Sequence, residues 1–183
     1  MKIVIITGSN RKSATSTRLA VNVGQLISKK GHQVQLFDLF ETPLPFYSPE
    51  GIGFDHATVQ SLQQAMLQAD GVVLSTPEYH GSLSGVLKNA LDFLGQEHFR
   101  GKAVLSMSSS GGAVGTSSLL QLQSIVRNLH GINSPDWVSI GGAQRNELAD
   151  GFADYEGSGQ GINDRIHRAA LSFLELAAQV RGN

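Results

Sequence analysis

The sequence predicts an α/β fold in which a parallel sheet of five strands is covered by helices on both faces. Short runs rich in Val and Ile alternate five times with longer segments whose apolar residues recur at helical spacing. Loops rich in glycine or hydroxyl residues follow several of these runs, as in α/β proteins that bind a ligand closely. We expect residues 1–183 to form a single domain, because this length suffices for one sizeable core.

Composition excludes several classes of protein and site. The formal net charge is −1, so we expect neither a nucleic-acid partner nor an anionic membrane partner. Cysteine is absent, which excludes disulfides, thiolate metal sites and thiol nucleophiles. The histidines are scattered without ligand spacing, so no metal site is predicted. With neither a signal peptide nor a membrane span expected, the predicted location is cytoplasmic.

The first half of the chain predicts two strands and two helices. Residues 2–7 are mostly β-branched and read as a strand buried on both faces, followed by a helix over 15–29. Residues 32–39 alternate polar and apolar side chains, as an edge strand does. After a proline-rich loop, Asp55 is expected to cap a helix that ends near Gln68.

The second half continues the alternation and contains the most unusual segment of the chain. A buried strand over 71–75 is expected to end at Pro77, with a polar and aromatic elbow before a helix that begins near Leu83. The residues from Gly141 to Gly161 are polar and glycine-rich, and predict a long connection. The other elements are expected as a strand at 102–107, a helix ending near 129, a strand at 137–140 and a helix at 163–180.

The alternation also predicts where a ligand binds. Five strands joined by right-handed crossovers favour the order 2-1-3-4-5, whose switch point lies between the first and third strands. The loops after those strands are Gly8–Thr17 and Pro77–Ser82. Because ligands of open α/β sheets bind at this point, the two loops are the predicted site.

The loop Gly8–Thr17 has the composition of a phosphate site. It supplies five hydroxyl residues and Arg11 at the start of a helix, where unpaired amides favour anions. It contains neither G-x-x-x-x-G-K-[ST] nor G-x-G-x-x-G, so a terminal phosphate monoester fits better than a diphosphate. The alternative is an ordinary helix start with solvated polar residues.

Both loops resemble one known family. The run Gly8-Ser9-Asn10-Arg11-Lys12-Ser13 and the segments Thr76–Ser82 and Gly85–Asp92 are similar to the NADPH-dependent FMN reductase family, in its azoreductase and quinone-reductase branch. The resemblance implies a flavodoxin-like fold, bound FMN, NADPH or NADH as co-substrate, and a homodimer or homotetramer. Many members carry asparagine in place of His80 and proline in place of Ser84, whereas the azoreductase-like branch resembles this chain at both.

The resemblance also implies roles for individual residues. Carried over by position, the FMN phosphate would be held by Ser9, Arg11, Ser16 and Thr17, and the isoalloxazine ring would be lined by Pro77, Glu78, Tyr79 and His80. Glu78 would orient its loop or meet the ring N–H, and Tyr79 would pack against the ring or remain a half-buried loop aromatic. His80 would donate a proton to a substrate, bond the flavin edge or lie in solvent. No catalytic residue is required, because a flavin carries its own reactivity.

A third loop completes the predicted site. Ser110, Gly111 and Gly112 follow the fourth strand at a helix start, where amides could stabilise the negative charge that reduced flavin gathers near N1 and O2. The alternative for this run is a glycine-rich turn.

These features favour an enzyme that passes hydride from NADPH through FMN to quinones, azo compounds, metal oxyanions or free flavin. A second possibility is a flavodoxin-type electron carrier, which needs a protein donor. Such carriers are usually strongly acidic, and this nearly neutral chain is not. A third possibility is a phosphate-binding regulator without a flavin.

Overall fold

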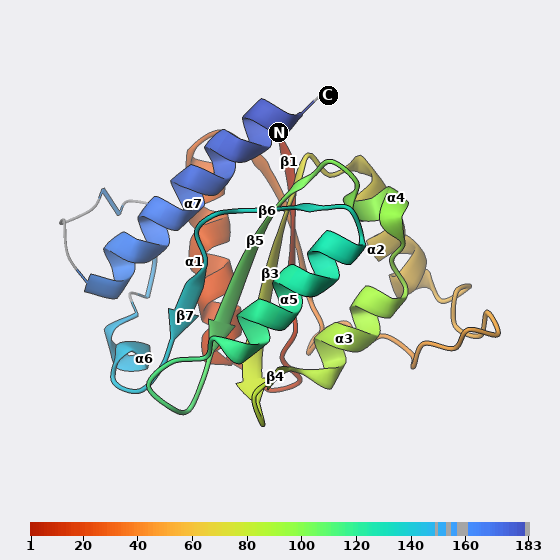
Figure 1. The fold of residues 1–183 in the computed structure, drawn as a ribbon, viewed down its shortest axis with the longest axis horizontal. Coiled ribbons are helices and arrows are strands. Elements are labelled where there is room, and N and C mark those ends of the chain that lie inside the picture. The colour runs from red at the N-terminus through yellow and green to blue at the C-terminus, as the bar shows by residue number, and fades with distance from the viewer. Residues whose placement is uncertain (149, 153–154, 157–160, 182–183) are drawn as a thin grey trace.

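The computed structural model describes residues 1–148, 150–152, 155–156 and 161–181, and these form a parallel sheet between two layers of helices (Figure 1). Strand β1 (Lys2–Thr7) lies between β2 (Gln33–Asp38) and β3 (Gly71–Tyr79), and β5 (Ala103–Ser109) pairs with the other side of β3. All of these pairings are parallel. The predicted strand order and the α/β fold class are therefore confirmed.

The fifth position of the sheet is divided between two short strands. Strand β6 (Ile132–Asn133) pairs with the start of β5, and β7 (Val138–Ile140) pairs with its end. The sequence predicts only the second of these. Pro135 lies between them. A proline has no N–H to donate to a neighbouring strand, and it restricts the backbone conformation of the residue before it. Two-residue pairing of this kind has no periodicity by which a sequence could reveal it.

Helices cover both faces of the sheet. Helices α1 (Thr15–Lys29) and α7 (Gly161–Val180) pack on one face. Helices α2 (Ala57–Gln68), α3 (Gly85–Asp92) and α5 (Ser117–Asn128) pack on the other. The sheet thereby separates two hydrophobic cores, and its central strands are buried on both sides, as predicted.

Most predicted helix faces and boundaries are confirmed, with small corrections. The helical spacing of Val59, Leu62, Met66 and Leu67 predicts that all four point inward, but Leu67 is 49% exposed. The cap of α2 is His56, whose Nδ1 accepts a hydrogen bond from the amide of Thr58 at 3.3 Å, so the expectation for Asp55 is wrong. Helix α3 begins at Gly85 because the Ser84 side chain caps it, slightly later than predicted.

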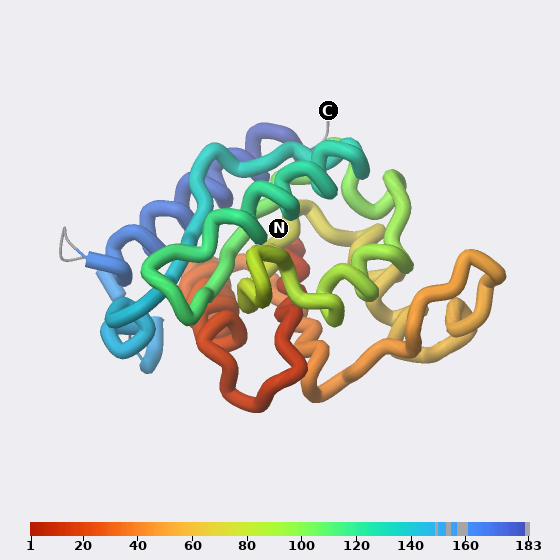
Figure 2. Tube along the Cα trace, turned by 60° about the horizontal axis from the view of Figure 1, so that its bottom comes forward, coloured from red at the N-terminus to blue at the C-terminus, as the bar shows by residue number. Residues whose placement is uncertain are grey.

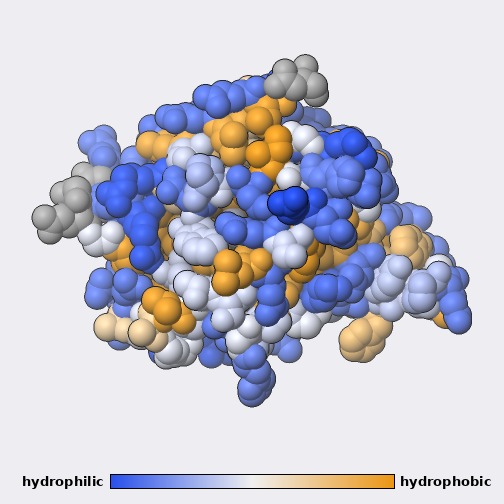
Figure 3. All heavy atoms as spheres, viewed as in Figure 1, coloured by the Kyte–Doolittle hydropathy of each residue, from blue (hydrophilic) through white to orange (hydrophobic). Residues whose placement is uncertain are grey.

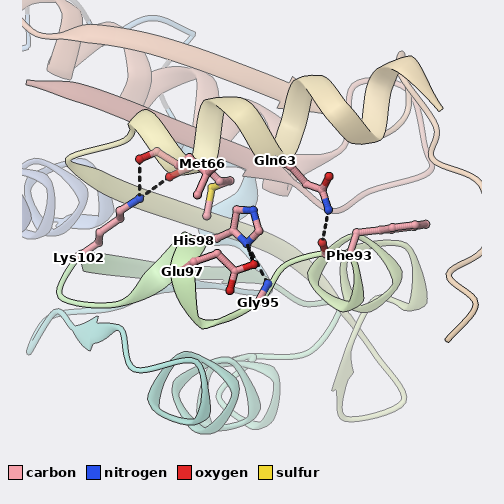
Figure 4. Close-up of polar contacts among 8 residues, drawn as sticks. Gln63, Met66, Phe93, Gly95, Glu97, His98 and Lys102 are labelled. Atoms are coloured by element: carbon pink, nitrogen blue, oxygen red, sulfur yellow. Dashed lines mark hydrogen bonds and ion pairs between the residues drawn. The ribbon is translucent and has the colours of Figure 1, made fainter. Parts of the chain in front are cut away.

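Two short helices were not predicted. Helix α4 (Gln96–Phe99) lies against α2, and the residues that flank α4 make polar contacts with α2 (Figure 4). The His98 Nδ1 accepts a hydrogen bond from the Gly95 amide at 2.9 Å, and the Lys102 ammonium donates to the last carbonyls of α2. Helix α6 (Gln144–Glu147) lies in the predicted connection from Gly141 to Gly161, part of which falls outside the described residues.

The segment between β2 and α2 extends away from the body of the molecule (Figures 1 and 2). We call residues 40–55 the arm. It exposes several large apolar side chains, among them Phe46 at 91% and Ile52 at 64%. The face in view in Figure 3 is otherwise largely hydrophilic, with hydrophobic groups in small patches. None of the helices within the described residues is long and apolar enough to cross a membrane.

Candidate functional site

Three segments meet at the carboxyl ends of the central strands, where Figure 2 brings them forward. They are the loop after β1, the segment 76–84, which includes the end of β3, and the loop 110–116 after β5. The parallel register places them side by side, since β1, β3 and β5 are neighbours in the sheet. The structure thus brings together the three loops that the sequence predicts as a site.

The elbow after β3 is a β-hairpin. Strand β3 continues to Tyr79, and β4 (Ser82–Leu83) returns antiparallel to it with Tyr79 opposite Ser82. The two turn residues between them have positive φ angles, 52° at His80 and 74° at Gly81. Two positive φ values in a two-residue hairpin loop are the signature of a type I′ turn. Asparagine, aspartate and histidine are the residues other than glycine that tolerate this conformation, which explains a histidine there.

The expectation that Pro77 ends the strand is wrong, and the hydrogen bonding explains why. Gly8 donates its amide to the Ser75 carbonyl at 2.8 Å, so the backbone groups of Ser75, and of Pro77 two residues later, face the side of β1. Strand β1 ends at Thr7, opposite Ser75. Within the part of the chain that the structure describes, no strand pairs with Pro77 on that side, and the missing N–H therefore costs no ladder hydrogen bond.

Hydrogen bonds lock the hairpin to the loop after β1. The Ser84 hydroxyl donates to the Gly8 carbonyl and accepts from the Leu87 amide at 3.1 Å. The Ser75 hydroxyl donates to the Ser16 carbonyl at 2.8 Å. A Cβ atom added at Gly8 would lie 2.4 Å from the Leu87 Cβ, so only glycine allows this close approach. The two parts of the predicted site are therefore one rigid unit.

The start of α1 presents hydrogen-bond donors without partners. Ser16 Oγ and Thr17 Oγ1 are buried, and neither has a hydrogen-bond partner among the described residues. The cap residue Ala14 offers no side-chain acceptor, so the first-turn amides are not capped by a side chain. These donors fit a bound anion such as a phosphate monoester.

Ser9 and Arg11 have different surroundings within this loop. The buried Ser9 hydroxyl accepts a hydrogen bond from the Arg11 amide at 3.1 Å, so it shapes the loop. Arg11 is exposed, and no hydrogen bond or ion pair of its guanidinium to the described residues is seen. Ser13 has a φ of 54°, which bends the chain into α1.

The hairpin side chains divide into a fixed base and an exposed tip. Glu78 accepts hydrogen bonds from the Ser118 amide and hydroxyl, both at 2.9 Å, and thereby caps α5, which has no side-chain cap of its own. Tyr79 is 45% exposed and His80 is exposed. Of the two roles that the sequence leaves open for Glu78, the geometry favours orienting the hairpin.

In the third loop, 110–116, Gly111 and Gly112 have no other atoms close to the position that a side chain would occupy. The Ser110 amide donates to the Ile140 carbonyl at 2.8 Å, and the Ser110 hydroxyl donates to the Gly112 carbonyl at 3.1 Å. A Cβ added at Gly111 or Gly112 would meet nothing within 4 Å, so this stretch is open to a ligand. Ser110 is occupied with shaping the loop, while the two glycines are exposed.

Three residues that shape the site were not predicted as part of it. Thr76 accepts from the Ser84 amide at 3.0 Å, Ser118 binds Glu78, and Ser139 Oγ accepts from the Gly115 amide at 2.7 Å. Their partners lie between 8 and 40 residues away in the chain. The only signal in the sequence is that serines cluster where strands end.

Comparison with known proteins identifies the family. The family model described as NADPH-dependent FMN reductase matches residues 1–145. An FMN-dependent NADPH-azoreductase of Staphylococcus aureus is 36% identical over 143 residues, which cover 76% of each chain. The family match spans the loop after β1, the hairpin and the loop 110–116.

Solved structures share the fold at low sequence identity. An NADH:FMN oxidoreductase in its apo form has a TM-score of 0.71 at 19% identity, covering 100% of this chain and 91% of that one. The NAD(P)H:(acceptor) oxidoreductase of Paracoccus denitrificans has a TM-score of 0.72 at 18% identity, covering 98% of each. An archaeal flavodoxin has a TM-score of 0.62 at 13% identity, covering 98% of this chain and 99% of that one. The fold is therefore flavodoxin-like, and the chain belongs to the NADPH-dependent FMN reductase family, with FMN as its cofactor and a nicotinamide nucleotide as its co-substrate.

Proposed function

We propose that this protein transfers electrons from NADPH through FMN to a small-molecule acceptor: a quinone, an azo compound, a metal oxyanion or free flavin. The observation that carries the proposal is the pair of buried, unpartnered hydroxyls of Ser16 and Thr17 beside a hairpin that is locked to the same loop. A phosphate at the start of α1 would satisfy these donors. The attached ring would then lie toward the hairpin.

Each loop has a separate task in this proposal. Arg11, Ser16 and Thr17 would bind the phosphate of FMN, and Ser9 would keep their loop in shape. Pro77, Glu78, Tyr79 and His80 would form the wall beside the isoalloxazine ring. The exposed amides of Gly111 and Gly112, after Ser110, would face its polar edge. When bound, FMN supplies the hydride-transfer chemistry.

The protein side chains would bind and orient, with little acid–base work of their own. Glu78 is held by Ser118, which suits a positioning residue rather than a base. His80 is exposed at the turn, where it could donate a proton to an acceptor that has entered the site. The turn geometry alone explains its presence, so we assign it no required role.

The openness of the site bears on which classes of acceptor it could take. Tyr79 and the glycine pair are exposed, so a flat acceptor needs only to stack over the ring. The similarity to an azoreductase supports azo compounds as one class. A flavodoxin-type carrier is the alternative, and the net charge of −1 disfavours it because carriers dock on basic partners through strongly acidic surfaces.

Two measurements test the proposal. The purified protein should carry flavin absorbance bands or acquire them on addition of FMN, and a protein that does neither would contradict the proposal. Anaerobic NADPH should then bleach those bands without a partner protein. If bleaching requires a second protein, the carrier is the correct function. A panel of quinones, azo dyes, metal oxyanions and free FMN, with NADPH against NADH, would rank acceptors and donors.

We further propose that the protein acts as a homodimer or homotetramer. The arm supports this, because it exposes Phe46 at 91% and Ile52 at 64%, and clustered exposed apolar side chains usually mark an interface. Light scattering after gel filtration should give a multiple of 19.5 kDa, and Phe46→Glu should reduce it. A wild-type monomer would refute the assembly. The single domain and the cytoplasmic location remain predictions of the sequence.

A further inference from the structure

A cavity of about 420 Å³ lies beside the loop 110–116, on the side away from the hairpin. The first turns of α7, the segment 135–137 and the residues before α5 enclose it. The polar residues that line it include Arg165, Arg168, Thr116 and Asp136, and Trp137 is among the lining residues as well. This volume lies within the range of about 300–1,000 Å³ that is usual for small-molecule sites.

The two arginines give the cavity an excess of positive charge. Within the described part of the chain, no carboxylate forms an ion pair with Arg165 or Arg168. The Arg165 guanidinium donates to the Ser139 carbonyl, but its Nε–H is buried and has no partner among the described residues. Burial, and then the neighbouring charge of Arg168, lower the pKa of Arg165. Arg168 is exposed, so the cost falls mainly on the partly buried Arg165, whose orphaned Nε–H an anion in the cavity would satisfy.

We propose that this cavity binds a tetrahedral oxyanion, a phosphate or a sulfonate, carried on an apolar or aromatic group. Arginine matches such oxyanions because its planar fork donates two parallel hydrogen bonds. Thr116 would add a hydroxyl donor, and Trp137 would contact the apolar part of the ligand. Among the described residues, the cavity-lining Asp136 pairs with neither arginine.

The cavity is coupled to the proposed flavin site through one residue. Arg165 donates to the Ser139 carbonyl, while the Ser139 hydroxyl accepts from the Gly115 amide at 2.7 Å. Gly115 and the cavity-lining Thr116 belong to the same loop as Gly111 and Gly112. On the proposed function, the oxyanion would be a nucleotide phosphate of the co-substrate or the acidic group of an acceptor.

The test uses the only tryptophan of the sequence, Trp137, as its reporter. Its fluorescence is followed while adenosine 2′,5′-bisphosphate, toluenesulfonate or inorganic phosphate is added to the FMN-loaded protein, and again without FMN. We expect a saturable change that weakens as salt is raised. Adenosine, which has the same ring without a phosphate, should give none. A response to the bisphosphate but not to toluenesulfonate identifies a nucleotide phosphate, whereas a response to toluenesulfonate adds acidic acceptors.

Matched variants decide whether the arginines are responsible. Arg165→Gln and Arg168→Gln should each weaken binding by about tenfold or more, as expected for loss of a charge-assisted hydrogen bond. Arg127→Gln, which removes an exposed arginine of α5 away from the cavity, should leave binding unchanged. Equal affinity in all three variants would overturn the proposal, as would the absence of a saturable change or an equal response to adenosine. Titration of FMN into each variant shows separately whether the flavin site is intact.

Discussion

The hairpin 76–84 and the start of α1 lie against each other, yet they differ in whether their polar side chains have hydrogen-bond partners. In the hairpin, Thr76, Glu78 and Ser84 all make hydrogen bonds within the protein. At the start of α1, Ser16 Oγ and Thr17 Oγ1 are buried without a partner among the described residues. Unsatisfied buried donors cost folding free energy, so they are retained where a ligand completes them.

The difference separates two kinds of contribution to one site. The hairpin contributes shape, and its hydrogen bonds should contribute to the stability of the protein without ligand. The start of α1 contributes ligand affinity, and its free hydroxyls should cost stability until FMN binds. Substitutions on the two sides should therefore change different measured quantities: stability of the apoprotein for the hairpin, and FMN affinity for the start of α1.

The largest effect is expected where the two regions touch. Gly8→Ala would place a Cβ atom 2.4 Å from the Leu87 Cβ, which forces α3 away from the loop. We expect the free energy of unfolding in urea to fall by about 2–3 kcal/mol. Gly85→Ala is the control, because its Cβ would meet nothing within 4 Å. Equal losses in the two variants would show that the contact between loop and helix is unimportant.

Arg11→Ala should weaken FMN by about 1.5–3 kcal/mol, the usual contribution of a hydrogen bond to a charged group. Its affinity for riboflavin, which has no phosphate, should change little. Arg11 is exposed, so protein stability should also change little. Both affinities can be measured by quenching of flavin fluorescence. Similar losses for FMN and riboflavin would remove Arg11 from the phosphate site.

Ser84→Ala tests the hairpin side. The substitution removes a helix cap and leaves the Gly8 carbonyl and the Leu87 amide without their partner. Loss of an N-cap hydroxyl costs about 0.5–2 kcal/mol, and urea unfolding of the apoprotein should show a loss in this range. Unchanged stability would mean that the hairpin is not held by this residue.

Ser16→Ala and Thr17→Val should give the reverse result. Each removes a buried hydroxyl without a partner, so the apoprotein should be as stable as wild type or more stable. FMN affinity should fall by about 0.5–1.5 kcal/mol for each hydrogen bond lost. The comparison between the two regions would fail if these variants lost apoprotein stability and kept their affinity for FMN.

The smallest effect concerns pH. Burial lowers the pKa of His98, an effect that Glu97 partly opposes, and neutral Nδ1 accepts the Gly95 amide. As pH falls below about 6.5, His98 therefore takes up a proton in the unfolded chain before it does so in the folded protein. The free energy of unfolding then decreases with falling pH, by at most about 1.4 kcal/mol per pH unit from this group. This dependence of stability on pH should be weaker in His98→Gln. FMN affinity depends on residues away from His98, so it should change with pH equally in both proteins. Parallel stability curves would contradict this.

Periodicity and composition predicted much of the fold. Helix α1 spans the predicted residues 15–29 because its apolar spacing is unbroken. The hairpin was misjudged, because proline usually ends a strand and nothing local reveals that β1 stops opposite Ser75. The division between β6 and β7 was missed because each is too short to show periodicity.

The sequence predicted which loops form the site, but not the hydrogen bonds that connect them. Spacing and strand order brought the correct segments together, and serine and threonine indicated hydroxyl donors. Which hydroxyls are free was not predictable, since Ser84 and Ser16 look alike in sequence. Their difference depends on distant partners, such as the Gly8 carbonyl 76 residues from Ser84.

The type I′ turn also has a consequence for how such a protein can change over time. Its base is held by Glu78 and Ser84, while only Tyr79, His80 and Gly81 project at the tip. A substitution at Tyr79, or one at His80 that tolerates a positive φ, alters what an incoming molecule meets and leaves the scaffold intact. Selectivity can therefore diversify at the tip in single steps, without a compensating change elsewhere in the fold.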